Sequence, residues 1–161
     1  MRQSSRFALI ALAGLSSVLV VAAAEGESAR SHSGAVVKTA FNKTLKKAII
    51  VDGAGHTLYM FTSDVGGKPG TCAALGTACT KLWPAYTSVG APAAGPGIKA
   101  SLLGTATGPG GKQQVVYNHH PLYHFAGGQG YGPGDKKPGD IGGQGIYKIW
   151  YVLSAKGTPI K

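Results

Sequence analysis

The chain has 161 residues, with 26 Gly and 9 Pro, and its basic residues outnumber its acidic residues by 16 to 6. Its glycines have no period of three and only one long apolar run occurs, which excludes a collagen triple helix and a multi-pass membrane protein. A hydrophobic fraction of 43% is enough for a core, and the abundance of glycine and proline predicts a small, turn-rich all-β protein.

The N-terminal segment has the pattern of a secretory signal peptide over residues 1–24. Arg2 and Arg6 precede an apolar run that ends in three alanines, where signal peptidase could cleave. The alternative is an uncleaved anchor, because a run of about 18 apolar residues can just span a bilayer. We expect export to the periplasm or the extracellular space, no membrane span after cleavage, and a flexible leader over residues 25–35.

Short β-branched or aromatic runs bounded by turn residues predict strands. The predicted strands cover residues 36–41, 48–52, 57–62, 102–107, 113–117, 121–125 and 147–153. Turn signals join two pairs of them into hairpins, over 48–62 and 102–117. One short irregular helix is expected at 71–82, and a long glycine-rich loop at 127–145.

Two cysteines, Cys72 and Cys79, are the only ones in the chain. In an oxidising compartment such a pair is expected to form a disulfide. A metal site would need further ligands nearby, and no His or third Cys lies between them.

The chain contains an internal repeat. Residues 56–61 (His-Thr-Leu-Tyr-Met-Phe) align with residues 120–125 (His-Pro-Leu-Tyr-His-Phe), and a Trp follows each copy. Neither strand-turn-strand unit can bury its own apolar face, so we expect the two to pack into one core. The predicted fold is a single β domain over 36–158, made of repeats at about 36–87 and 100–156.

These motifs resemble a bacterial secreted-repeat family, often lipoproteins, that carries a Tyr-x-aromatic-x-x-Asp motif. The first copy fits over residues 59–64 and is followed by the cysteine pair and Trp83-Pro84. The second resembles the family in 118–123, in Gly-Asp-x-x-Gly-Gln-Gly at 139–145 and in Trp-Tyr-Val at 150–152. The resemblance implies an exported two-repeat protein and carries no settled activity.

Two departures from the family pattern stand out. Gly128 occupies the place of the second Asp, and residues 128–134 form an insertion that displaces the acid to Asp135. The lipobox cysteine that would carry a lipid is also missing, which sets this chain apart from the lipoproteins that it resembles.

The motif residues have two readings. As alternate residues of a strand, Tyr59 and Phe61 share one face, and a packed aromatic pair followed by a turn-capping Asp64 is a complete structural account. The functional reading is a shallow aromatic site with a carboxylate at its rim. The motif residues that could form such a binding site are Tyr59, Phe61, Asp64, Tyr123, Phe125, Asp135 and Asp140.

The aspartates also have two readings. Each of Asp52, Asp64, Asp135 and Asp140 sits close to a glycine in a predicted turn, which favours turn capping. The alternative is Ca²⁺ binding, which needs several oxygen ligands brought together.

Histidines form the second candidate site. His119, His120 and His124 fall within six residues, and His56 is the repeat mate of His120. Imidazole clusters bind Cu, Zn, Ni or haem iron. The even spacing of His120 and His124 places them on one face, so these two, with His56, are the candidate metal ligands.

Lysines dominate the charge. Lysines at 38, 43, 46 and 47 cluster before the first predicted turn, and Lys136-Lys137 lie in the long loop. Such a surface attracts polyanions. Nucleotide-binding, hydrolase and sequence-specific nucleic-acid motifs are absent, so no catalytic residue is assigned. The leading hypothesis is an exported, non-enzymatic cell-envelope module that binds anionic envelope components or a protein partner. The alternative is a periplasmic or extracellular metal- or haem-binding protein.

Overall fold

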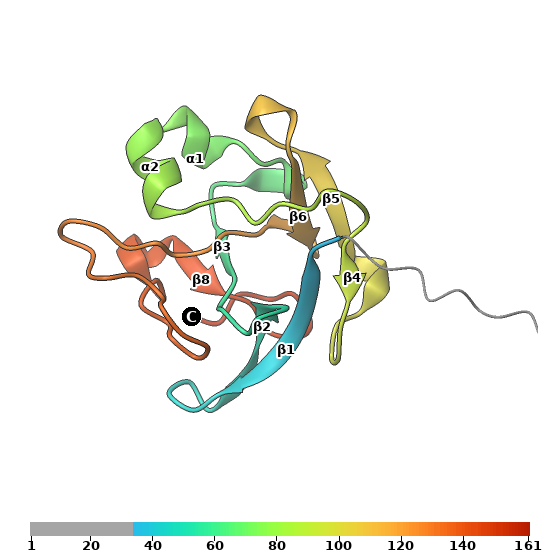
Figure 1. Cartoon of the computed structure of the whole chain (residues 1–161). Helices are drawn as coiled ribbons and strands as arrows, with labels where there is room; N and C mark the ends of the chain where they lie inside the picture. The colour runs from blue at the N-terminus through green and yellow to red at the C-terminus, as the bar shows by residue number, and fades with distance from the viewer. Residues whose placement is uncertain (1–33) are drawn as a thin grey trace, which may run out of the picture. The chain divides into compact units, whose positions relative to one another are not determined.

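The computed structural model describes residues 34–161 (Figure 1). The predicted signal peptide and almost all of the predicted leader lie outside the described residues. Strands β1 (Val36–Asn42) and β2 (Lys47–Asp52) form an antiparallel hairpin in which Val37 pairs with Asp52 and Asn42 with Lys47. The short β4 (Ala93–Ala94) adds to the start of β1 in parallel. The hairpin follows from the β-branched run Ile49–Val51, which the sheet buries.

A second sheet lies beside the first and contains β5 (Leu103–Thr107), β6 (Gln113–Tyr117) and β7 (His120–Pro121) in that order. The predicted hairpin over 102–117 is confirmed, with Leu103 paired to Tyr117. The connection between β6 and β7 is a two-residue turn, and both Asn118 and His119 have left-handed φ angles of 47° and 63°. Such a turn matches the twist of the strands it joins.

The predicted hairpin over 48–62 forms only next to its turn, where Val51 bridges to Thr57 and the N–H of Leu58 donates to the carbonyl oxygen of Ile50. Beyond Leu58 the chain leaves β2, and strand β3 (Tyr59–Phe61) pairs with β8 (Trp150–Val152), near the other end of the chain. The physical reason is burial, because residues 57–61 are all buried, and a strand buried on both faces belongs in the interior beside another buried strand.

The strand predicted at 121–125 is shorter than expected. It is regular only in β7, although Tyr123 forms single bridges to Tyr59 and Ala85. The strand predicted at 147–153 is regular only in β8, because Tyr147 and Lys148 have left-handed φ angles inside η4 (Ile146–Lys148). Positive φ is incompatible with an extended strand.

The predicted irregular helix at 71–82 forms two short helices, α1 (Thr71–Ala74) and α2 (Thr77–Leu82). Gly76, with φ of 99°, interrupts them, and the predicted Cys72–Cys79 disulfide joins them. Shorter 3₁₀ turns are η1 (Val65–Gly67), η2 (Ala100–Leu102) and η3 (Pro109–Gly111). No helix within residues 34–161 is long and apolar enough to cross a bilayer.

The central pair β3–β8 carries an apolar cluster on each face. Tyr59 and Phe61 belong to one cluster, whereas Leu58 and Met60 belong to the other. In the same way, Trp150 and Val152 face the first cluster, and the residues that alternate with them face the second. The fold is mainly β, as predicted, and the alternation places the tyrosine and phenylalanine of each motif, together with Trp83 and Trp150, in one cluster.

Candidate functional site

Tyr59 and Tyr123, the matching tyrosines of the two repeats, lie at the centre of the molecule. The backbone N–H of each donates to the backbone carbonyl oxygen of the other, and both N···O distances are 2.9 Å. This reciprocal pair is what an approximate two-fold relation between the repeats produces. The two motifs are therefore joined at their tyrosines.

The tyrosine hydroxyls cross from one repeat to the other. The Tyr59 hydroxyl donates to Oδ2 of Asp135 and the Tyr123 hydroxyl donates to Oδ2 of Asp64, each at 2.6 Å. We call these two hydrogen bonds the clasps. Each aspartate of the motif thus serves the tyrosine of the other repeat and not its own.

The insertion in the second repeat leaves the clasp geometry intact. The N–H of Asp64 donates to the carbonyl oxygen of Phe61 at 3.1 Å, and that of Asp135 donates to the carbonyl oxygen of Phe125 at 3.0 Å. Between Phe125 and Asp135 the chain folds back on itself over 127–134, where Gly128 bridges to Gly132. Asp135, the acid that the insertion displaces along the chain, therefore occupies the structural position of the motif aspartate, as the sequence predicted.

Four aromatic rings form a stack between the repeats. Phe61 stacks on Trp150 at a centroid distance of 4.3 Å, Trp150 on Trp83 at 3.8 Å, and Trp83 packs on Phe125 at 4.7 Å. Each phenylalanine therefore packs on the tryptophan of the other repeat. The tyrosines meet the tryptophans edge-on, as aromatic rings prefer.

The environment of the clasps keeps the phenols protonated. Burial, reinforced by the hydrogen bond to the carboxylate, raises the pKa of Tyr59 and of Tyr123 well above the ordinary value. Burial also raises the pKa of Asp135, against the opposing effect of the hydrogen bond from Tyr59. Phenol and carboxylate thus act as donor and acceptor in a water-poor interior.

The Gly-Gly-Gln-Gly segment completes one clasp. The N–H of Gly142 donates to Oδ1 of Asp135 at 2.8 Å, and the N–H of Gly143 donates to the Tyr59 hydroxyl at 3.2 Å. A Cβ on Gly143 would lie 2.6 Å from the Trp83 ring, so no other residue fits there. Gln144 accepts from the N–H of Val152 and ties the segment to β8.

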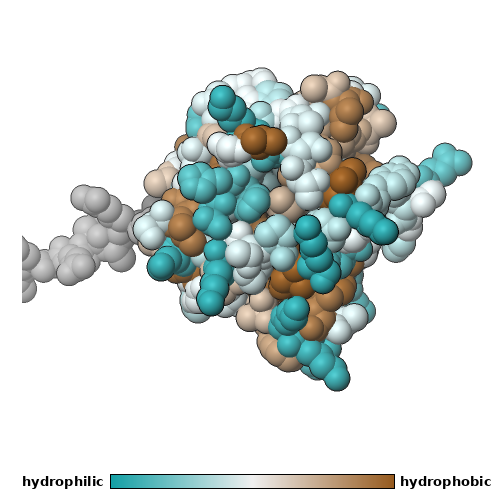
Figure 2. Space-filling view, turned by 180° about the vertical axis from the view of Figure 1, so that it is seen from behind, coloured by the Kyte–Doolittle hydropathy of each residue, from teal (hydrophilic) through white to brown (hydrophobic). Residues whose placement is uncertain are grey.

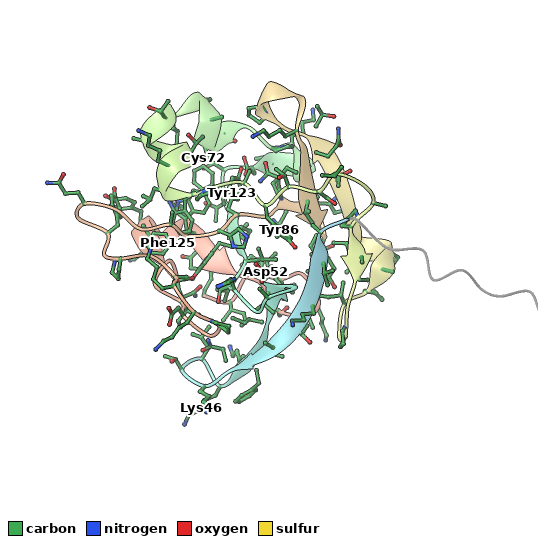
Figure 3. All side chains as sticks on the ribbon, viewed as in Figure 1. Lys46, Asp52, Cys72, Tyr86, Tyr123 and Phe125 are labelled. Atoms are coloured by element: carbon green, nitrogen blue, oxygen red, sulfur yellow. A yellow bond between two sulfur atoms is a disulfide. The ribbon has the colours of Figure 1, made fainter. Side chains whose placement is uncertain are left out.

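The motif residues point into the core. Tyr59, Phe61, Tyr123 and Phe125 are each at most 3% exposed, and Asp64 is 4% exposed. Figure 3 shows Tyr123 and Phe125 in the middle of the fold. Asp140 lies in the loop and accepts from the N–H groups of Lys136 and Lys137, which lowers its pKa. This placement is that of a structural clasp and a turn cap.

The structure brings together a different pair of histidines from the one expected. His56 and His124 both lie beside Asp52, with ring nitrogens 3.5 and 3.7 Å from Oδ2. The His124 ring also meets Tyr86 edge-on, and burial raises the pKa of Tyr86 to about 12.

His120, by contrast, lies in β7 next to β6, and its Nδ1 is buried without a hydrogen-bond partner. Burial lowers the pKa of both His120 and His124. Within residues 34–161, no three His, Cys, Asp or Glu side chains are arranged to hold a metal ion.

The sequence reasoning missed the central role of Trp83 and Trp150. A usable signal was present, because each repeat has a tryptophan after its tyrosine motif. It also missed the hydrogen bond between the hydroxyls of Tyr131 and Tyr147, 2.8 Å apart. No signal in the sequence could have found that pair, since the insertion that supplies Tyr131 has no counterpart in the first repeat.

Comparisons with known proteins agree with this geometry. A family model described as "Secreted repeat of unknown function" matches residues 42–87 and 104–154, together more than half of the chain. No curated protein and no solved structure matches. Each matched segment holds one tyrosine of the clasps and one tryptophan of the stack. The chain therefore belongs to this secreted-repeat family, with two repeats.

Proposed function

We propose that the protein is a non-enzymatic binding module of the cell envelope, and that it binds anionic envelope polymers through its lysines. The observation that carries this proposal is the state of the carboxylates. Every lysine and every aspartate of the chain lies within residues 34–161. In that part of the chain both ion-pair contacts join Asp52 to histidines, and no lysine pairs with a carboxylate.

The aspartates are all used for other purposes. Asp64 and Asp135 accept from tyrosines, Asp140 accepts from backbone N–H groups, and Asp52 accepts from the N–H groups of its own turn. Most lysine charges within residues 34–161 therefore have no acidic partner, although Asp140 lies close enough to Lys137 for their charges to attract. A surface of this kind attracts polyanions and does so less at high salt.

One group of exposed lysines is the best candidate for the polymer-binding surface, because two segments that carry them lie together. The side chain of Asn42, at the end of β1, donates to the carbonyl oxygen of Gly139 at 3.0 Å and so ties the β1–β2 turn to the loop at 136–140. We call the exposed lysines of these two segments the lysine face. They are Lys43, Lys46, Lys47, Lys136 and Lys137. Figure 3 shows Lys46 projecting from the tip of the hairpin.

The test compares two variants of equal charge. Replacing the five lysines of the lysine face with glutamine is expected to weaken binding of lipoteichoic acid or polyphosphate at least tenfold, about 1.4 kcal/mol. The control replaces five exposed lysines elsewhere, namely Lys68, Lys99, Lys112, Lys156 and Lys161. Equal loss in both variants would show that net charge alone acts, and no loss in either would refute the proposal.

A further inference from the structure

An apolar pocket opens on the surface beside the aromatic stack. It has a volume of about 240 Å³, and the rings of Phe61, Trp83 and Trp150 contribute to its lining. Its other walls come from the two helices, the insertion and η4. The large side chains of these walls are Leu75, Leu82, Tyr131, Ile146, Tyr147 and Ile149. In Figure 2, hydrophobic surface is visible at the corner that holds the helices.

The pocket offers few free hydrogen-bonding groups to a polar ligand. Among the large side chains that line it, only Tyr131 and Tyr147 carry a hydroxyl group, and these two hydroxyls form a hydrogen bond with each other at 2.8 Å. A sugar or nucleotide would bury its own polar groups there without partners, which costs free energy. An apolar chain gains by leaving water instead. The volume is below the roughly 300–1,000 Å³ of pockets for drug-sized ligands, so one flexible chain fits better than a ring system.

The rim of the pocket has an unusual local structure. Leu75 is 65% exposed and Tyr147 is 71% exposed, although both are large and hydrophobic. Tyr147 has a φ of 51°, a left-handed conformation that is costly for an aromatic residue and that gathers at ligand sites. The rim of the pocket therefore presents apolar side chains to solvent.

Two exposed lysines are neighbours in the chain of residues that line the pocket. Exposed Lys81 directly precedes Leu82, and exposed Lys148 lies between Tyr147 and Ile149, three residues that line the pocket. No carboxylate contributes to its lining. Long lysine side chains that start beside the lining residues can reach a head group at the pocket mouth, which favours an anionic head.

We propose that this pocket binds a free single-chain anionic amphiphile, of the fatty-acid type, with the alkyl chain along the apolar walls that Leu75 and Tyr147 border and the anionic head toward Lys81 and Lys148. The site is separate from the lysine face and does not depend on polymer binding.

The probe is decanoate below its micelle concentration, with decanol and decyltrimethylammonium as neutral and cationic molecules of equal chain length. The chain contains two tryptophans, and both line the pocket, so their fluorescence reports occupancy directly. Calorimetry gives an independent Kd. We expect decanoate to bind more tightly than either analogue, and this preference to disappear in the Lys81→Gln/Lys148→Gln variant.

A second variant tests the apolar contacts. Leu75→Ser/Tyr147→Asn removes two exposed side chains, and asparagine tolerates the left-handed φ, so the fold is retained. We expect at least tenfold weaker decanoate binding, about 1.4 kcal/mol. The matched control is Phe41→Ser/Val89→Ser, which removes two hydrophobic side chains that are 68% and 94% exposed elsewhere. The variants also separate this site from a smaller cavity between α1 and η3, which Trp83 lines but Leu75 and Tyr147 do not.

Several results would overturn the proposal. These are no binding of monomeric decanoate, equal weakening by the control variant, or retained binding in Leu75→Ser/Tyr147→Asn. Binding to phosphatidylglycerol vesicles without binding of monomeric decanoate would indicate a lipid surface as the partner instead. The glutamine variant of the lysine face should leave decanoate binding unchanged, so failure of the polymer proposal and failure of this one are distinguishable.

Discussion

The two repeats reach the same geometry from different sequences. In the first, Asp64 follows Phe61 by three positions, whereas in the second Asp135 follows Phe125 by ten. Both aspartate N–H groups nevertheless donate to the phenylalanine carbonyl oxygen, and both carboxylates hold a tyrosine of the other repeat. The motif is thus defined by a contact between repeats and not by its spacing along the chain.

The segments between aspartate and tryptophan differ much more. The first repeat covers its side of the core with α1 and α2 and a disulfide, while the second uses a glycine-rich loop and η4. The core side chains are matched in kind, whereas the covering segments share neither structure nor sequence. The features that distinguish the two halves of this protein, including most of the walls of the apolar pocket, therefore come from the segments that cover the core.

The largest expected effect comes from breaking the aromatic stack. Trp83→Ala and Trp150→Ala should each lower the free energy of unfolding by about 3–5 kcal/mol, the usual cost of emptying an aromatic core site. The two costs should be similar, because each tryptophan packs on the other and on one phenylalanine. Urea unfolding curves measure both. A large loss in only one variant would contradict a core shared equally by the repeats.

The disulfide tests the difference between the covers. Cys72→Ala/Cys79→Ala should lower the free energy of unfolding by roughly 2–3 kcal/mol in the chain-entropy model, since the bridge closes a short loop. Reduction with dithiothreitol should destabilise the wild type by the same amount and should leave the stability of the variant unchanged. If the protein unfolds at the same denaturant concentration with and without the disulfide, the segment of α1 and α2 is stable without it.

The elements that the sequence predicted well are those set by local pattern. The β-branched run of β2, the turn between β5 and β6, the cysteine pair and the repeat itself all have strong local signals. The hairpin predicted over 48–62 shows the limit, because its turn and first bridge form as expected but the strand after them pairs with β8. Pairing across about 90 residues depends on which faces become buried, and turn residues carry no information about that.

The candidate sites show the same limit. Sequence spacing placed Tyr59 and Phe61 correctly on one face, but it could not show that their carboxylate partner lies in the other repeat. Likewise, the spacing of His120 and His124 suggested neighbours, whereas Asp52 brings His124 next to His56. Contacts between repeats depend on how the units pack, and a single sequence reveals them only through its repeats.

The clasps themselves can be distinguished by removing one hydroxyl at a time. Tyr123→Phe and Tyr59→Phe should each cost about 1–3 kcal/mol, because a buried carboxylate loses its donor. Tyr123→Phe should cost more, since Asp64 keeps only a long contact of 3.3 Å to the N–H of Thr71, whereas Asp135 keeps one of 2.8 Å to Gly142. Thermal or urea unfolding measures the difference, with Tyr151→Phe as a control. The reverse order would contradict this ranking of the clasps.

Acid should weaken the fold at His124. Burial holds the pKa of His124 below its unfolded value of about 6.5, so the unfolded chain takes up the proton more readily. The contribution of neutral His124 to stability is therefore complete above that pH and is lost as the pH falls toward the folded pKa. His124→Gln should therefore flatten the fall in stability that sets in as the pH drops below about 6.5. Coincident pH profiles of wild type and His124→Gln would contradict the expectation.

The smallest expected effect comes from making the second repeat resemble the first. Deletion of residues 127–133 leaves Phe125-Ala126-Gly134-Asp135, which has the spacing of residues 61–64. Because loop closure changes by only about 0.6 kcal/mol for each doubling of length, the free energy of unfolding should stay within roughly 1 kcal/mol of wild type. The clasp between Tyr59 and Asp135 should persist, since both repeats then make the same link from aspartate to phenylalanine. The deletion also removes Tyr131, so decanoate binding should weaken although the fold is kept. A stability loss as large as that of Tyr59→Phe would show instead that the insertion is needed to form the clasp.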